Sequence, residues 1–525
     1  MRGYLGLRHE FHHGRLVRAI PDRRGAIAEM LDAAVLRAPD RIALVDGNLR
    51  MTYRSLEDAV KRTADFFVTK GVEQGSRIAL LLANRADFVV ATLAAARLGA
   101  ICVPMNIRQK RPETTHMLVD SGAMLLLYEA DLLCEIPEAV DTPDLRHRIA
   151  VNDEARIWDV ASNVVKTPPV AAQNEDDSFC ILYTSGTTGR PKGAVLTQFG
   201  VITSCMGAVA ALDLAEGEVD VVTVPLSHVT GIVLNVMTVL HLAGTIVLHR
   251  AFKARHFLET AQAEGMTYCC VVPAMLVLCL REPDFAAFDL SAWRVCGFGG
   301  APMPDSAIES LATSNPGLRL SNIYGATETT SPSVVMPAAD ATSRRGQVGL
   351  PLPYCDLFIL DEEGREVERG QQGEIWIGGP HVIPRYWNNE PATLREFSGG
   401  LWRSGDIGAM DEDGFVRLYD RRKDVINRGG YKIYSVEVEN VLMAHPAVIE
   451  AAVVGKPCPV LGERVHAFVV VAPAAVEAAL LRQWCAERLS DYKVPDTVEL
   501  MSQPLPRNAN GKLLKRELRL AMGTD

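Results

Sequence analysis

The 525-residue sequence predicts an α/β protein. Between residue 26 and about residue 320, helical apolar periodicity alternates with short apolar or β-branched runs. Residues 77–82, 101–104 and 124–128 are typical of buried strands, and residues 86–98 are typical of a helix. Because parallel strands need crossover helices between them, this alternation predicts parallel sheets with helices on both faces.

A different texture begins near residue 331. Short strand-like runs at residues 356–360, 373–377 and 415–418 are separated by Gly, Pro and Asp-Gly turns. Closely spaced strands with tight turns favour antiparallel pairing, so residues 331–420 are expected to form a small barrel.

The chain ends in a compact α+β segment. It follows the charged run at residues 420–424, a plausible hinge between domains. Apolar patterns predict strands and helices in the order helix, strand, strand, helix, at residues 435–444, 449–454, 465–471 and 475–489.

Composition and charge narrow the class of protein. With 48% hydrophobic and 22% charged residues, the chain has the make-up of a soluble globular enzyme. A net charge of −10 provides no general affinity for nucleic acid or acidic membranes. The eleven cysteines are scattered without a CxxC pair, which is typical of reduced thiols. We therefore expect a cytoplasmic enzyme.

Two segments resemble targeting or membrane signals but fit neither. The first 25 residues carry six arginines and no apolar stretch, so they are not a secretory signal; a loose extension and an over-called start site both remain open. Residues 229–248 lack formal charge, yet Asn235 and His241 interrupt them. We expect a buried helix followed by a strand there, and no membrane span.

The most informative segment is residues 183–193. Directly after an apolar run it gathers hydroxyls, glycines and the cations Arg190 and Lys192, so its backbone and side chains can surround a polyphosphate. It is not a Walker loop, because Pro191 precedes Lys192 and Gly193 follows it. A magnesium ion would then need a carboxylate from elsewhere in the chain.

Two further segments suit a nucleotide. In residues 322–328 a tyrosine can stack on a base, a glycine admits close approach, and Glu328 can supply the missing carboxylate. Residues 299–302 are Gly-Gly-Ala-Pro, whose glycine spacing does not match a dinucleotide-binding fingerprint.

These motifs together resemble the adenylate-forming superfamily of acyl- and aryl-CoA synthetases, peptide-synthetase adenylation domains and beetle luciferases. The similarity covers residues 26 to 520 and includes further motifs at residues 225–231, 402–406, 427–434 and 506–512. It implies an N-terminal domain (residues 26–422) of two doubly wound α/β subdomains plus the barrel. A mobile C-terminal lid (residues 423–525) would turn about Lys423, and residues 1–25 would be an extension.

The resemblance also implies the site residues. Lys512, Glu328, Thr327 and His228 would serve catalysis, and Glu328 with Thr184 would hold Mg²⁺. The ATP site would comprise Thr184, Ser185, Gly186, Thr187, Thr188, Gly189, Lys192, Gly300, Ala301, Pro302, Asn322, Tyr324, Gly325, Ala326, Thr327, Asp406, Arg421 and Lys512.

Two more sets concern the other substrates. Coenzyme A would pass along Gly429, Gly430, Tyr431 and Lys432. The acyl group would lie against His228, Val229, Gly231, Ile232, Val272, Gly297, Gly299 and Ala326. The sequence departs from the family pattern at Arg385, Asp420 and Cys458, where Gly, Gly and often Asp are usual.

The implied reaction is the ATP-dependent joining of a carboxylic acid to coenzyme A through an acyl-adenylate. In this family, adenylation domains for amino acids carry an aspartate near the position of His228, and malonate-type ligases carry an arginine near the position of Leu278. This sequence has no matching residue in either place, which argues against amino acids and dicarboxylates. The remaining apolar lining suits a fatty, aryl or alicyclic acid, and the choice stays open. A fatty acyl-AMP ligase, a luciferase-like oxygenase and a catalytically silent binding protein are the alternatives, and either a monomer or a homodimer is expected.

Overall fold

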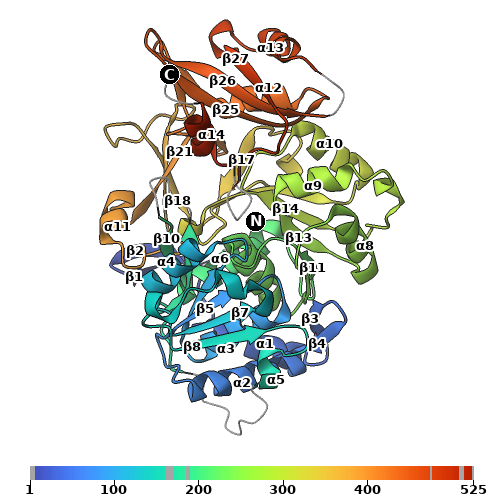
Figure 1. Ribbon diagram of the computed structural model, residues 1–525, viewed down its shortest axis with the longest axis vertical. Helices are drawn as coiled ribbons and strands as arrows, with labels where there is room; N and C mark the ends of the chain where they lie inside the picture. Colours follow the sequence, from blue (N-terminus) through green and yellow to red (C-terminus); the bar gives the residue numbers. More distant parts are fainter. Residues whose placement is uncertain (1–5, 161–170, 185–189, 473–475, 508–512, 523–525) are drawn as a thin grey trace. The chain divides into compact units, whose positions relative to one another are not determined.

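The protein is represented by a computed structural model, which describes residues 6–160, 171–184, 190–472, 476–507 and 513–522. The chain divides into two compact units (Figure 1). The first unit comprises Met1–Leu357 and Ile377–Trp402, and the second comprises Phe358–Trp376 and Arg403–Asp525. The expected domain boundary at Lys423 stays a prediction.

One sheet of the first unit has the strand order β10-β9-β6-β5-β7-β8. All neighbours are parallel except β9 and β10, which form an antiparallel hairpin. Its central strands are apolar on both faces, as expected when helices cover both faces of a parallel sheet. The strands are β5 (Arg77–Leu81), β6 (Ile101–Met105), β7 (Leu125–Glu129), β8 (His147–Val151), β9 (Ser178–Thr184) and β10 (Lys192–Thr197).

The second sheet of this unit runs β17-β16-β15-β14-β13-β11-β12-β3-β4. Its middle, from β15 to β3, is parallel, and β4, β16 and β17 are antiparallel additions. The strands are β3 (Ile42–Asp46), β4 (Leu49–Thr52), β11 (Val219–Val222), β12 (Thr245–Leu248), β13 (Tyr268–Val271), β14 (Val295–Gly299), β15 (Arg319–Tyr324), β16 (Val334–Val335) and β17 (Gln347–Pro351).

Helices connect these strands and confirm the expected α/β alternation. The segment expected to be a buried helix and strand is a π-helix, η3 (Thr230–Met237), continued by α7 (Thr238–His241) and β12. The other helices are α1 (Ile27–Arg37), α2 (Tyr53–Thr69), α3 (Ala86–Arg97), α4 (Arg111–Ser121), α5 (Ile157–Val160), α6 (Gln198–Leu212), α8 (Ala254–Glu264), α9 (Pro273–Leu280), α10 (Asp305–Ser314) and α11 (Glu390–Glu396). Within the described ranges, none has the length and apolar character to cross a bilayer.

The expected barrel is wrong. Residues 331–420 form open ladders, not a closed barrel: β16 extends the second sheet antiparallel to β15, and β21 (Leu401–Met410) pairs with β22 (Val416–Arg421). Each strand order in the described part of the chain has two free ends. Strand spacing and turns show only that strands pair locally; they do not show whether the last strand returns to the first. The other strands here are β18 (Asp356–Leu360), β19 (Gly373–Gly378) and β20 (Phe397–Ser398).

The second unit carries the expected α+β segment. Its sheet has the order β24-β23-β26-β25, and β27 pairs parallel with β26. The elements are β23 (Ile426–Arg428), β24 (Tyr431–Ile433), α12 (Ser435–Met443), β25 (Val448–Cys458), β26 (Gly462–Val471), α13 (Ala478–Ala486), β27 (Thr497–Met501) and α14 (Lys515–Ala521).

The N-terminal segment is not a loose extension. Residues Arg8–His12 (β1) and Arg15–Ala19 (β2) form a hairpin in the first unit. Val17 and Ala19 are buried against Phe199, the second residue of α6. Arg15, Arg18 and Arg23 of this segment donate to carbonyl or carboxylate oxygens of the first unit.

Candidate active site

The segment expected to bind phosphate, residues 183–193, which we call the phosphate-loop motif, belongs to the β9–β10 hairpin of the first unit. Residues 179–183 of β9 are buried, and Thr184 at its end is opposite Lys192, the first residue of β10. The loop residues Ser185–Gly189 lie outside the described residues. The hairpin register therefore holds the two ends of the loop together, with a hydroxyl at one end and an ammonium at the other.

Lys192 is enclosed by an acid and an aromatic ring. Its Nζ lies 2.6 and 2.7 Å from the two carboxylate oxygens of Glu396, and 4.2 Å from the ring centre of Tyr386. The lysine side chain is only 12% exposed. Since Glu396 carries its counter-charge, an anionic ligand that approaches Lys192 must compete with this carboxylate.

The hydroxyl of Tyr386 lies between the carboxylates of Glu396 and Glu328. It lies 2.9 Å from Oε1 of Glu328 and 2.7 Å from Oε2 of Glu396. Burial, with the two neighbouring carboxylates, raises the pKa of the Tyr386 phenol far above its usual range. Although burial acts to raise the pKa of Glu396, hydrogen bonds from Lys192 and Tyr386 lower it overall. The phenol thus remains a neutral donor.

Residues 381–387, which we call the junction segment, carry Tyr386. Backbone hydrogen bonds join this segment to the residues around Glu328 and Lys192. Ile383 N donates to Glu328 O (2.9 Å), and Trp387 N donates to Gly193 O (2.7 Å). Val195 N donates to Arg385 O (3.3 Å), so the segment pairs with β10. The junction segment therefore connects the turn that carries Glu328 to the strand that begins at Lys192.

The two glycine-containing nucleotide motifs follow neighbouring parallel strands, β14 and β15. Gly299 ends β14, and a Cβ there would lie 2.1 Å from Ile323 O, so only glycine fits. Gly300 has φ +80°, a conformation that favours glycine, and begins the exposed turn with Ala301 and Pro302. Asn322, Tyr324, Gly325 and Ala326 lie at the end of β15 or just after it, half-buried.

Thr327 and Glu328 open the short 3-10 turn η5 (Thr327–Thr329). Ala326 N donates to Thr329 Oγ1 (3.1 Å), which closes this turn. Parallel strands present their carboxyl ends at one sheet edge, and ligands of α/β proteins bind at that edge. These motifs therefore lie at the sheet edge where α/β proteins commonly bind ligands, and their role in nucleotide binding stays a prediction.

Two of the expected acyl-site residues, Gly297 and Gly299, lie on one face of the second sheet. Gly297 and Gly299 share a face of β14 with Cys270 of β13, because these positions pair in register and alternate in direction. The helix η3 lies on this face, since Asn235 Nδ2 donates to Asp220 Oδ2 (2.7 Å) and Cys270 O (3.3 Å).

Other residues expected at the acyl site, His228, Val229, Gly231 and Ile232, lie at or just before the start of η3, whereas Val272 lies between β13 and α9. Val229 and Ile232 are buried, whereas His228 and Val272 are half-buried. Thr230 N donates to His228 Nδ1 (3.2 Å), and a Cβ on Gly231 would lie 2.3 Å from Pro225 O. The imidazole orientation is thus tied to the first turn of η3.

The remaining candidates belong to the second unit. Asp406 and Arg421 lie opposite each other on β21 and β22, with Arg421 Nε 3.2 Å from Asp406 Oδ1. Burial lowers the pKa of Lys423, although Asp424 acts to raise it. Lys512 lies outside the described residues, and the structure describes each unit by itself.

The glycine loop predicted to form the coenzyme A channel is the β23–β24 turn. Gly429 and Gly430 have φ +60° and +91°, as a tight hairpin requires. Gly429 N donates to Leu461 O (2.7 Å), and Tyr431 stacks on Tyr492 with ring centres 4.6 Å apart. Lys432, next in the loop, is exposed.

The departures from the family pattern have local explanations. Asp420 is buried and accepts hydrogen bonds of 2.5 Å from both Ser435 N and Ser435 Oγ, at the start of α12. The Cys458 thiol accepts backbone N–H groups from Leu461 and Val460, which lower its pKa. A carboxylate at position 458 would accept the same donors, which explains why Asp is compatible there.

Sequence reasoning missed Glu396 and the role of Tyr386. Glu396 is one of two glutamates in α11 and lies 204 positions after its partner Lys192. No motif marks it. The available signal was the aromatic pair Tyr386-Trp387, which precedes the polar residues Asn388 and Asn389.

Comparison with known proteins agrees with these motifs. Residues 31–387 match the AMP-binding enzyme family, and residues 437–512 match the AMP-binding enzyme C-terminal domain. A feruloyl-CoA synthase from Amycolatopsis sp is 34% identical over 492 residues, 93% of this chain and 97% of that protein. The long-chain-fatty-acid–CoA ligase FadD13 of Mycobacterium tuberculosis is 31% identical over 479 residues, covering 90% and 93%.

Solved structures agree as well. O-succinylbenzoate CoA synthetase (MenE) from Bacillus subtilis, in complex with the acyl-adenylate intermediate OSB-AMP, superimposes with TM-score 0.85 at 31% identity. The match covers 95% of this chain and 98% of that one. A second structure of the same synthetase contains ATP and a magnesium ion, with TM-score 0.84, 31% identity and coverage of 93% and 99%.

Proposed function

The chain belongs to the AMP-binding enzyme family, and from this premise we propose that it joins an apolar carboxylic acid to coenzyme A. The acid attacks the α-phosphorus of ATP, pyrophosphate leaves, and the thiol of coenzyme A then displaces AMP from the acyl-adenylate. The observation that carries the proposal is the cluster of Lys192, Glu328, Tyr386 and Glu396 beside the phosphate-loop motif.

In the first half-reaction, Lys192 binds the phosphates in place of Glu396. A cation of this kind stabilises the charge that spreads over the leaving pyrophosphate. Glu328 and Thr184 offer the oxygen donors that Mg²⁺ prefers, and Tyr386 orients the Glu328 carboxylate by its hydroxyl. The ion, when bound, neutralises phosphate charge.

Lys512 completes the adenylation site. Attacking carboxylate and α-phosphate are both anionic, so a cation between them is the group most needed in the transition state. Asp406 and Arg421 would bind the ribose, and the base would lie against Tyr324 and the 300–302 turn.

In the second half-reaction, rotation about Lys423 withdraws Lys512 and brings in the loop of Gly429, Gly430, Tyr431 and Lys432. Two consecutive glycines without bulky side chains leave room for a narrow pantetheine arm. His228 would control access of the thiol to the acyl group. Both fatty and aromatic acids are activated by named relatives, and the apolar residues around η3 suit either class.

A pyrophosphate-release screen over fatty, aryl and alicyclic acids, with and without coenzyme A, tests the proposal. We expect acid-dependent pyrophosphate release, with acyl-CoA identified by mass spectrometry only when coenzyme A is present. An acyl-adenylate that accumulates and does not react with coenzyme A would instead identify an acyl-AMP ligase. Oxygen-dependent light or CO₂ release would identify a luciferase-like enzyme, and the absence of ATP turnover with every acid would reject the proposal.

A further inference from the structure

The N-terminal hairpin β1–β2 is tied to the first unit by a buried arginine. Arg23, whose side chain is 5% exposed, donates to Glu10 Oε2 (2.6 Å) and Glu175 Oε2 (2.5 Å). Its guanidinium also lies 4.6 Å from the ring centre of Phe199. One side chain thus joins β1 to the residues just before β9 and to the start of α6, just after β10.

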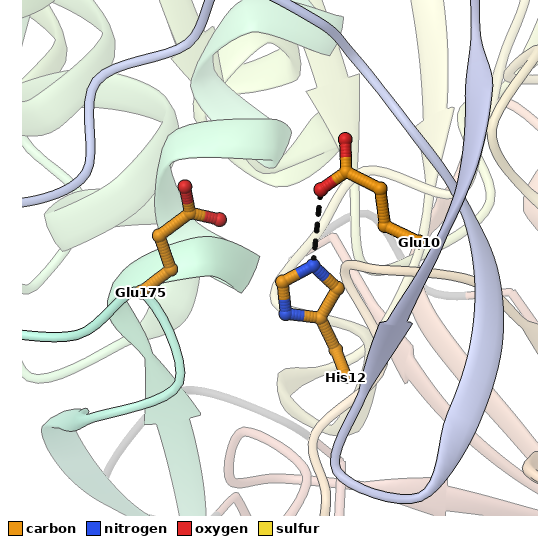
Figure 2. Close-up of side chains that lie close together, drawn as sticks. All are labelled: Glu10, His12 and Glu175. Atoms are coloured by element: carbon orange, nitrogen blue, oxygen red, sulfur yellow. Dashed lines mark hydrogen bonds and ion pairs between the residues drawn. The ribbon is translucent and has the colours of Figure 1, made fainter.

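Glu10, His12 and Glu175 converge in a way that resembles a metal site (Figure 2). Their ligand atoms lie within 4.8 Å of one another. However, Arg23 already provides the positive charge: its hydrogen bonds, opposed by burial, lower the pKa of Glu10 to about 2. His12 Nδ1 lies 2.7 Å from Asp176 Oδ1, and its ring stacks on Phe199 with centres 4.0 Å apart. The cluster is therefore an anchor for the hairpin, completed by its own arginine.

A second arginine connects the hairpin to the junction segment. Arg15 Nη2 donates to Val382 O (2.9 Å), one residue before Ile383, whose N–H binds Glu328 O. The Arg15 side chain passes along the backbone of Gly400, where a Cβ would lie 3.3 Å from Arg15 Cδ. Burial lowers the pKa of the Arg15 guanidinium, although nearby Asp176 acts to raise it. This contact is enclosed rather than a surface contact.

The anchor points of Arg23, His12 and Arg15 share one property: each borders a segment that supplies the Lys192 cluster. Glu175 and Asp176 precede β9, which ends at Thr184, and Phe199 follows β10, which begins at Lys192. Val382 lies four positions before Tyr386. The hairpin therefore holds β9, β10 and the junction segment at the ends opposite their candidate site residues.

We propose that the N-terminal hairpin is a clamp that positions Lys192, Glu328 and Tyr386 for ATP, with Arg15 as the positioning residue for the junction segment. The inference builds on the proposed function. Its physical basis is that a catalytic group displaced by about 1 Å can lose about a hundredfold in rate, so segments that carry such groups need support from behind.

The test compares Arg15→Ala with Arg18→Ala in the full-length protein. Arg18 is the matched control, because it lies on the same strand but donates to Cys355 O (3.1 Å) and Asp356 Oδ1 (2.7 Å), neither of which belongs to the junction segment. The measurements are acid-dependent pyrophosphate exchange at varied ATP, thermal midpoints, and hydrogen exchange of the peptides that contain Ile383, Val195 and Trp387.

We expect Arg15→Ala to raise the KM for ATP about tenfold and to leave the KM for the acid unchanged. Exchange at the Ile383 amide should accelerate, whereas Arg18→Ala should change neither quantity at a comparable thermal midpoint. Arg15→Lys, which keeps the charge and a donor, should recover part of the ATP affinity.

Equal effects of Arg15→Ala and Arg18→Ala on the KM for ATP would show a merely structural role and overturn the clamp. Unchanged exchange at the junction segment in Arg15→Ala would overturn it as well. If the wild-type protein turns over no ATP with any acid, the proposed function fails, and the exchange comparison alone then decides whether the hairpin holds the junction segment.

Discussion

The Tyr386 hydroxyl lies 2.9 Å from Glu328 Oε1, and so connects the expected magnesium ligand to the residues around Lys192. The ring of the same tyrosine lies 4.2 Å from the Lys192 ammonium. One side chain therefore contacts both the cation and the carboxylate that the two sequence motifs provide. The ring contacts the Lys192 ammonium and the hydroxyl donates toward Glu328, so the two contacts can be removed separately.

Tyr386→Phe separates them. The variant keeps the ring against Lys192 and removes the single O–H that Glu328 and Glu396 share, so the Glu328 carboxylate loses a donor that orients it. We expect kcat/KM for Mg·ATP in pyrophosphate exchange to fall about tenfold to a hundredfold, as found when partners of metal-binding groups are removed. Titration with Mg²⁺ should show a higher requirement for the ion.

Tyr128→Phe is the control for this prediction, since Tyr128 is a buried tyrosine of β7 outside the cluster. Equal Mg²⁺ requirements in Tyr386→Phe and the wild type would contradict the orienting role of the hydroxyl.

Lys512→Ala and Gly430→Ala should separate the two half-reactions. Lys512 is expected only in adenylation, so Lys512→Ala should reduce acyl-adenylate formation at least about hundredfold and spare thioester formation from supplied acyl-adenylate. Gly430 has φ +91°, which an alanine does not readily adopt, so Gly430→Ala should slow thioester formation and spare pyrophosphate exchange. Equal loss in both half-reactions for either variant would be incompatible with domain alternation.

The buried Asp220–Asn235 pair predicts a pH-dependent stability. Burial raises the pKa of Asp220 to about 8, against about 4 for an exposed aspartate. Asp220 Oδ1 has no hydrogen-bond partner in the described structure, and burial without a second donor favours the neutral, protonated carboxyl. The folded state thus retains a proton that the unfolded state has lost above about pH 4.

The free energy of unfolding should therefore fall as the pH rises from about 4 to about 8, and this contribution should level off above pH 8. Asp220→Asn has no proton to lose, so its thermal midpoint should vary less over the same range. The measurement is the thermal midpoint of both proteins from pH 5 to pH 9. Parallel profiles would show that Asp220 does not titrate in this window.

Gly297→Ala tests whether this glycine serves the acyl site or the packing of the sheet. A Cβ at Gly297 would lie 2.6 Å from Ile323 Cδ1 and 3.4 Å from Cys270 Sγ, so the space is already filled by the protein. We expect the variant to lose about 1–3 kcal/mol of stability from overpacking. Ile323→Val removes the clashing methyl group and should restore the thermal midpoint of the double variant.

The acid specificity of the same variants decides between the two roles. If Gly297→Ala changes the preference among acids and leaves the thermal midpoint unchanged, the neighbour of Gly297 is the substrate and not the Ile323 side chain.

The sequence by itself determined the α/β alternation of the N-terminal part, the helix–strand–strand–helix order near the C-terminus, the family and the identity of the motif residues. Apolar periodicity is a local property, so β5, α3, β6 and β7 lie where it predicts them. Family motifs likewise are contiguous in the chain. Both kinds of feature can be predicted without knowing which residues far apart in the chain are in contact.

Only the tertiary structure decided that Glu396 neutralises Lys192, that Tyr386 reaches Glu328, and that the arginine-rich N-terminus is a docked hairpin. It also replaced the expected barrel with open mixed sheets. All four depend on residues far apart in the chain, and charge or turn composition does not specify which distant partner a side chain or strand edge will meet. The packing of β9, β10 and the junction segment places Glu396 beside Lys192. A buried ammonium without a counter-charge would cost too much free energy, so this pairing stabilises the fold.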